Sequence, residues 1–229
     1  MIGSFIKSTK DFINNAMKYA PLFIGLTLLV FGLITNNLAY LMSFVGMFVI
    51  IPIIVYVLYF IFDLLIAKKY PAMRLFDEAA SGRNAYAFII PSETEGQADA
   101  PFMWYTMIMF FMGYLIINAK ALYDYEVKNI SQTKEDSRKM RSLIGMIVSS
   151  IVLIVLLSFR SSYMAVPETA VGLVVLGIAA IGFALGWFDF LSSCSSPAKN
   201  VHLDDLYGIK TNILTPSPRK ICVARDTSD

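Results

Sequence analysis

The hydrophobic and polar positions of this chain form long apolar blocks separated by short polar stretches. In the longest block, residues 20–65, Asp63 carries the only formal charge and Thr35-Asn36-Asn37 forms the only polar turn. About 20 apolar residues are enough to cross the ~30 Å hydrocarbon core of a bilayer. The pattern therefore predicts a transmembrane hairpin within residues 19–67, with spans at 19–35 and 38–67.

Proline at position 52 lies midway along the second of these spans. A proline removes one backbone donor and clashes with the preceding helical turn, so we expect a kink near Pro52. Lys68 and Lys69 mark the end of the span, because lysine side chains extend toward the membrane surface from helix ends. Residues 68–100 then form a polar loop.

Three more apolar stretches follow, at residues 101–118, 143–159 and 171–192, and define a three-span region 101–192. The first two of these stretches are separated by residues 119–142, which hold six basic and four acidic residues. This mixture of charges is typical of two helical extensions that project into water as a charged hairpin, or of a solvated loop.

The two ends of the chain are more polar. Residues 1–18 place apolar side chains at three-and-four spacing with Lys7 and Lys18 on the opposite side, which predicts an amphipathic helix lying in the membrane interface. The alternative is a polar lead-in that continues as the first span. Residues 193–229 contain three prolines and little hydrophobic periodicity, and they are expected to form an extended polar tail.

These patterns predict an all-α integral membrane protein with about five transmembrane helices. The alternative is four spans plus a re-entrant segment, because the first apolar run is short and opens at Pro21. With five spans the basic residues divide almost evenly between the two sides of the membrane. With a re-entrant first segment most of them lie on one side, so the distribution of lysine and arginine leaves both topologies open.

Composition supports a membrane location, because 57% hydrophobic and only 16% charged residues would leave a soluble domain with too much apolar surface. The formal net charge of +2 provides no broad basic face for nucleic acid. The lipid bilayer is therefore an expected partner, and nucleic acid is not.

The residues needed for hydrolytic or metal chemistry are scarce. His202 is the only histidine, and the two cysteines, Cys194 and Cys222, are too scattered for a zinc site. Neither a Gly-x-Ser-x-Gly elbow nor a glycine-rich phosphate loop is present. We therefore expect no catalytic residues, no cofactor and no metal site.

Two carboxylates lie within the apolar stretches, Asp63 and Asp189. A charge at bilayer depth suggests function, because burying it in lipid is costly. Both positions are close to the end of a span, however, so helix-end solvation or ion pairing is favoured over an ion or proton path.

The last span contains small residues that favour close helix contact. Glycines spaced four apart let two helix backbones approach each other, and such contacts drive helix association in lipid. The expected packing face, toward another span or another subunit, consists of Gly172, Gly177, Gly182 and Gly186.

The charged hairpin and the polar tail are the expected contact surfaces for other protein subunits. Their cations are Lys134, Arg138, Lys139 and Arg141 in the hairpin and Arg219 and Lys220 in the tail.

In general build, the two spans flanking residues 120–141 and the tail 193–229 resemble the multi-spanning internal-membrane and minor capsid proteins of large icosahedral double-stranded DNA viruses. The resemblance covers residues 101–229. It implies a structural protein of the virion that links an internal membrane to the capsid shell.

The expected function is that of a non-enzymatic structural membrane protein in a large assembly. The competing hypothesis is a small ion channel or transporter, or an accessory subunit of an organellar membrane complex.

Overall fold

A computed structural model of the 229-residue chain describes residues 8, 9, 12, 19–62, 64, 102–125, 132–159 and 167–194. The expected interfacial helix 1–18, the polar loop 68–100, most of the tail, and the site residues Asp63, Arg219 and Lys220 lie wholly or largely outside this part of the chain. The described elements are all helical: α2 (Ala20–Thr35), α3 (Leu38–Val45), the π-helix η1 (Gly46–Ile50), α4 (Ile51–Phe62), α5 (Phe102–Asp124), α6 (Gln132–Phe159) and α7 (Pro167–Cys194).

Four helical segments are long and apolar enough to cross a membrane: Leu38–Leu58, Met103–Asp124, Gln132–Ser158 and Gly172–Ser193. This agrees with the helical, multi-pass character expected from the sequence. Helix α2 is shorter, with 16 residues. At ~1.5 Å per residue it is roughly 24 Å long, less than the ~30 Å hydrocarbon core.

Two asparagines form the polar turn between α2 and α3, and each has a different structural role. Asn36 adopts a left-handed conformation with φ of 50°, which ends α2. The side chain of Asn37 then accepts a hydrogen bond of 2.9 Å from the backbone N–H of Ala39 and caps the start of α3. Asparagine tolerates the left-handed region better than most residues, so this pair reverses the chain within two positions.

Replacing Asn36 with valine should lower the free energy of unfolding by about 1 to 2 kcal/mol, because a β-branched side chain is strained at positive φ. Replacing it with glycine, which adopts this conformation freely, should leave stability nearly unchanged. Denaturant unfolding of both variants in the same detergent checks this. Equal stability of the valine and glycine variants would contradict the left-handed turn.

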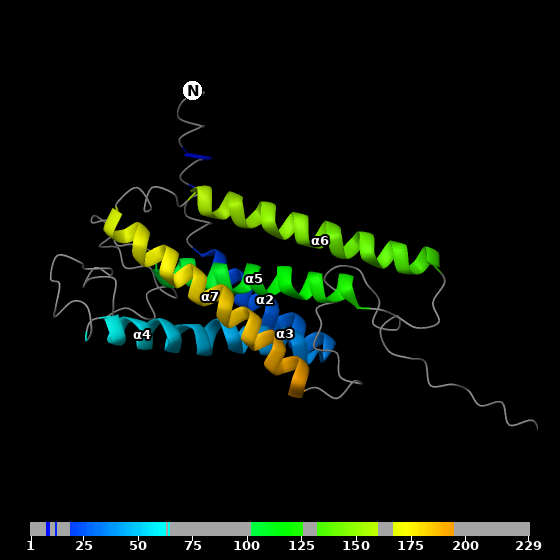
Figure 1. The fold of residues 1–229 in the computed structure, drawn as a ribbon, viewed down its shortest axis with the longest axis horizontal. Helices are drawn as coiled ribbons and strands as arrows, with labels where there is room; N and C mark the ends of the chain where they lie inside the picture. The colour runs from blue at the N-terminus through cyan, green and yellow to red at the C-terminus, as the bar shows by residue number, and fades with distance from the viewer. Residues whose placement is uncertain are drawn as a thin grey trace, which may run out of the picture.

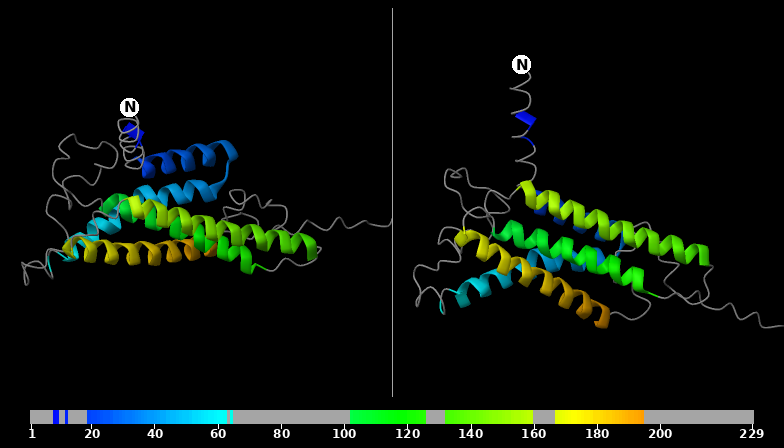
Figure 2. Two further views of the ribbon diagram at one scale, coloured as in Figure 1. Left: turned by 90° about the horizontal axis from the view of Figure 1, so that it is seen from above. Right: turned by 45° about the horizontal axis from the view of Figure 1, so that its top comes forward.

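The second apolar segment changes its helical hydrogen bonding part of the way along. The π-helical turn η1 lies directly before Pro52, the second residue of α4. Proline has no N–H to donate to the preceding turn, and π-turns and prolines both bend helices. In Figure 2, α4 leaves the line of α3, in the region where the sequence predicts a kink.

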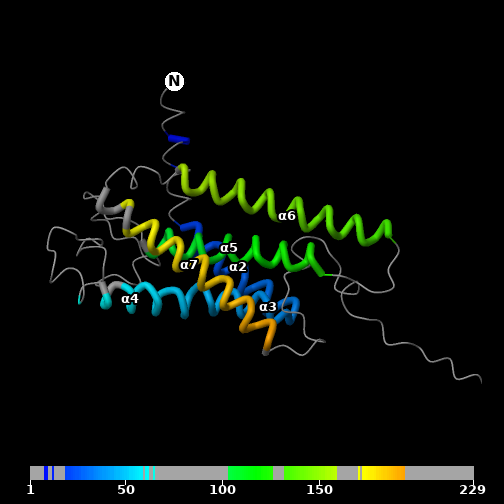
Figure 3. The backbone as a smooth tube through the Cα atoms, in the orientation of Figure 1, coloured from blue at the N-terminus to red at the C-terminus, as the bar shows by residue number. Residues whose placement is uncertain are grey.

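Helix α5 forms the centre of the described structure. It packs between α6 and α7 and is mostly buried, and α5, α6 and α7 run in alternating directions (Figures 1 and 3). Aromatic side chains fill the contact with α7: the ring centroids of Phe110 and Phe183 are 5.8 Å apart, and those of Tyr114 and Phe188 are 5.9 Å apart. Helix α6, in contrast, packs mainly on α5.

Helices α5 and α6 extend beyond the spans expected from hydropathy. Helix α5 continues past residue 118 to Asp124, and α6 begins at Gln132, well before the apolar stretch that starts at residue 143. Residues 119–124 and 132–142 are therefore helical continuations of the two spans.

Candidate functional site

A group of polar side chains is buried where the C-terminal end of α5 meets the N-terminal end of α6. Asn118 and Ser142 are fully buried, and Arg138 is 2% exposed. Within the described residues, Arg138 is the only buried side chain with a formal charge. We call Asn118, Leu122, Arg138 and Ser142 the α5–α6 polar junction.

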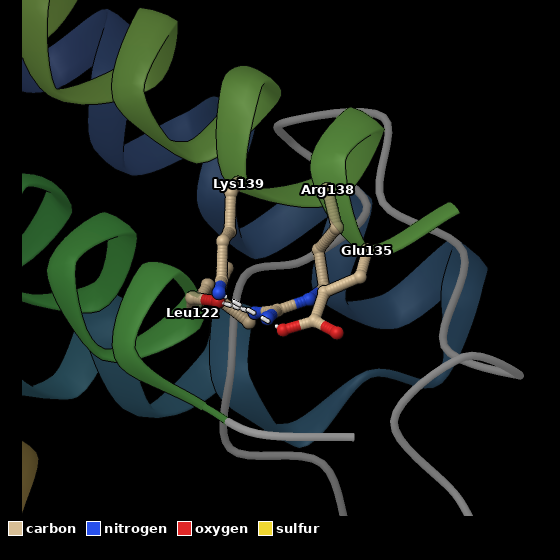
Figure 4. A network of polar contacts seen from close by, with 4 residues as sticks. All are labelled: Leu122, Glu135, Arg138 and Lys139. Carbon is tan, nitrogen blue, oxygen red and sulfur yellow. Dashed lines mark hydrogen bonds and ion pairs between the residues drawn. The ribbon is translucent and has the colours of Figure 1, made fainter. Parts of the chain in front are cut away.

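The guanidinium group of Arg138 ties the two helices together. Its Nη1 donates a hydrogen bond to the backbone carbonyl of Leu122 (Figure 4). Leu122 lies in the last turn of α5, where carbonyl groups lack the next turn of helix as hydrogen-bond donor and carry the negative end of the helix dipole. A cation at this position therefore caps α5 from the neighbouring helix.

The remaining polar groups of the junction are incompletely paired. Neither Nε nor Nη2 of Arg138 has a hydrogen-bond partner in the described part of the chain, and the same is true of the Ser142 hydroxyl. Burying a polar donor without a partner is costly, and burying an uncompensated charge costs more. These unpaired groups therefore need an explanation beyond helix packing.

An ion pair lies at the edge of the junction. The ammonium nitrogen of Lys139 is 2.9 Å from Glu135 Oε1, one helical turn away on α6. Both side chains are partly exposed, and they lie beside the Arg138 guanidinium in Figure 4. Glu135 is therefore already bonded to another cation.

The residue pattern of α6 explains why this polar face points inward. Arg138, Ser142, Ser149 and Leu156 are buried, and their spacing places them on the side that packs against α5. The other side carries exposed large apolar residues: Leu143, Ile144, Ile147, Val148, Ile151, Val152, Ile154 and Val155. This is the reverse of a helix in a water-soluble protein, where the apolar stripe faces the core.

The cations predicted to contact other subunits do not share one environment. Lys134 and Arg141 are exposed on α6, and Lys139 is bonded to Glu135. Arg138 is buried in the helix contact. The sequence shows that these four residues are cations, but it does not show that only one of them faces α5.

The four glycines of α7 also have different surroundings. Gly172 and Gly177 are buried, and a Cβ atom at Gly177 would lie 2.8 Å from the Tyr105 hydroxyl oxygen on α5. Gly182 and Gly186 are exposed, and a Cβ atom at either position would meet nothing within 4 Å among the described residues. Gly177 thus packs against another span, whereas the Gly182–Gly186 pair faces outward.

A contact among three helical segments involves Gly46, a glycine for which the sequence pattern predicts no packing role. A Cβ atom at Gly46 would lie 2.6 Å from Phe110 on α5 and 2.9 Å from the indole nitrogen of Trp187 on α7. That nitrogen donates a 3.2 Å hydrogen bond to the carbonyl of Met42. Gly46 follows no small-residue repeat, so its role depends on the position of two helices distant in sequence.

Asp189, for which the sequence favours helix-end solvation or ion pairing, is exposed on α7. It therefore lies on the surface of the described bundle rather than in its interior. The described helices contain no group of three or more His, Cys, Asp or Glu side chains that could hold a metal ion.

Comparison with known proteins gives no relative: no family model, no curated protein sequence and no solved structure matches this chain.

Proposed function

We propose that this protein is a structural membrane subunit that anchors a larger assembly to a bilayer. The observation that carries the proposal is the distribution of side chains on α6: its buried polar residues Arg138, Ser142 and Ser149 lie on the side that packs against α5, while most of its isoleucine and valine side chains are exposed. Membrane helices associate through small and polar residues and present large apolar residues to lipid. In this proposal α2 adds a fifth crossing to the four longer apolar segments.

A transport role receives less support from the described helices. Bulky side chains such as Phe110, Tyr114 and Met107 are fully buried in the contacts of the central helix α5. Asp189, the described carboxylate of the channel hypothesis, is exposed on α7. A carboxylate of a transport path faces a bundle interior or a water-filled cavity.

The contacts with other subunits are assigned to the first turns of α6 and to the tail. Helix α6 is continuous from its charged start to its apolar end. One rigid helix therefore connects the protein contacts in water to the part of the chain that lies in the bilayer. Lys134 and Arg141 are exposed at its charged start and give this part of α6 two cations at its surface. The general resemblance to viral internal-membrane proteins makes a virion membrane and its capsid shell one setting for this role.

Deleting residues 195–229 tests the proposal, because it removes the tail and leaves α7 (Pro167–Cys194) whole. We expect the shortened chain to insert into the membrane normally but to be lost from the large complex. Carbonate extraction measures insertion, and native gel electrophoresis of membranes solubilised in mild detergent measures complex size.

The matched control replaces the tail with a glycine-serine segment of equal length, which keeps the chain length but not its contacts. It should also fail to assemble. Normal incorporation of either variant into the large complex would refute the assignment of the tail as a contact surface.

A further inference from the structure

The unpaired nitrogens of Arg138 lie on one edge of its guanidinium group. Nη1 is occupied by the Leu122 carbonyl, whereas Nε and Nη2 have no hydrogen-bond partner among the described residues. In arginine, the Nε and Nη2 N–H bonds on this edge point in the same direction. This edge can bind two oxygens of a carboxylate or phosphate at once.

The charge of Arg138 is only partly compensated within the described helices. The C-terminal end of α5 supplies a partial negative charge through the Leu122 carbonyl, which is roughly half of one elementary charge for a helix terminus. Glu135, at the edge of the junction, is bonded to Lys139. A guanidinium group keeps its proton in proteins, so neutralisation requires an anion.

The position of the junction indicates which anion it would meet. Arg138 lies five residues before Leu143, where the apolar stretch of α6 begins, which is roughly 7 Å along the helix axis. In the proposed membrane orientation this is the level of the lipid headgroups. Three more cations, Lys120, Lys134 and Arg141, are exposed near this end of α5 and α6, together with two acids, Asp124 and Asp136, so the exposed charges are net positive. Together they favour a ligand that carries full negative charge.

We infer that the free edge of Arg138 binds a phosphate group, supplied by the headgroup of an anionic phospholipid. This inference rests on the proposed membrane location and adds a specific lipid contact to it. The phosphate accepts hydrogen bonds from Nε and Nη2 of Arg138. Because the Arg138 nitrogens are buried, the partly exposed Glu135–Lys139 pair opens to admit the ligand, and Lys139 then bonds to the phosphate.

Lipid-dependent thermal stability of the purified full-length protein in detergent tests the site. Phosphatidic acid should raise the midpoint of unfolding by about 5 °C or more at saturation. Diacylglycerol with the same acyl chains lacks the phosphate and should give no comparable rise. Inorganic phosphate separates the two sources of the ligand: an equal rise at similar concentration assigns the site to free phosphate, and a much smaller one assigns it to the headgroup.

Substitutions then identify the residue responsible. Arg138→Gln, and also Arg138→Lys, which keeps the charge but loses the two-nitrogen edge, should weaken the apparent affinity for phosphatidic acid about tenfold or more. The matched control is Arg141→Gln, an exposed arginine on the same helix. Because Arg141 adds only to the local positive charge, this variant should weaken the affinity clearly less than either Arg138 variant does.

A third variant, Glu135→Gln, leaves Arg138 intact and keeps the test decisive if the Arg138 variants do not fold. It removes the carboxylate that competes for Lys139, so the affinity for phosphatidic acid should increase. An unchanged or weaker affinity in this variant contradicts the site, as does full binding by Arg138→Gln or an equal response to diacylglycerol. None of these results affects the tail-deletion experiment, so the two proposals fail separately.

Discussion

Replacing Gly46 with leucine should cause a large loss of stability. A Cβ atom at this position already lies within 3 Å of both Phe110 and the Trp187 indole nitrogen, so the longer side chain has no space. Overpacking a core position by a few methylene groups costs about 1 to 3 kcal/mol, and here the displaced indole also loses its bond to the Met42 carbonyl. We expect a total loss of about 3 kcal/mol or more.

Denaturant unfolding of the protein in detergent, monitored by tryptophan fluorescence, measures this loss of stability. Gly182→Leu is the matched control, because it introduces the same side chain on α7 where a Cβ atom meets nothing within 4 Å among the described residues. It should be neutral or slightly stabilising, since leucine has a higher helix propensity than glycine. Equal losses for the two variants would show that η1 does not pack tightly against α5 and α7.

Replacing Ile151 with lysine should markedly reduce membrane insertion. Ile151 is 54% exposed and lies in the middle of the apolar part of α6. At the centre of a transmembrane helix, exchanging an apolar residue for lysine costs about 3 kcal/mol of insertion free energy. In a water-soluble protein, the same exchange at an exposed position would be harmless or would improve solubility.

The fraction of α6 that inserts can be measured with glycosylation acceptor sites on its two sides. Ile151→Leu should insert as well as the natural sequence. Ser137→Lys, an exposed position in the charged start of the same helix, should also have no effect. A lysine variant at position 151 that stays dissolved without detergent and keeps its helix content would refute the membrane assignment.

Much of the local structure could be predicted from the sequence. The polar turn at Asn36 and Asn37 separates two apolar helices as expected, because helix ends depend on the conformational preferences of a few neighbouring residues. The positions at which α5 ends and α6 begins are harder to predict from the sequence. Their charged ends have no hydropathy signal, and residues 119–142 were equally compatible with a loop.

The residues of the candidate site are harder to predict from the sequence than the helices are. The sequence identifies Arg138 as a cation of the charged hairpin, like Lys134 and Arg141, but only Arg138 is buried. Asn118 and Ser142 give no signal in the sequence, because an isolated asparagine or serine near a helix end is common. Only the antiparallel contact of α5 with α6 brings Leu122 beside Arg138 and forms the junction.

By itself, the sequence determined that long apolar helices are present, where they are interrupted, and that a bilayer is the environment suited to them. These properties are local, since the hydrophobicity of a segment depends only on its own residues. The tertiary structure decided that α5 is central, that Gly46 and Gly177 are packed while Gly182 is open, and that Arg138 is buried. The physical reason is that in a membrane protein apolar residues line both lipid and helix contacts, so hydropathy does not reveal which face of a helix meets its neighbour.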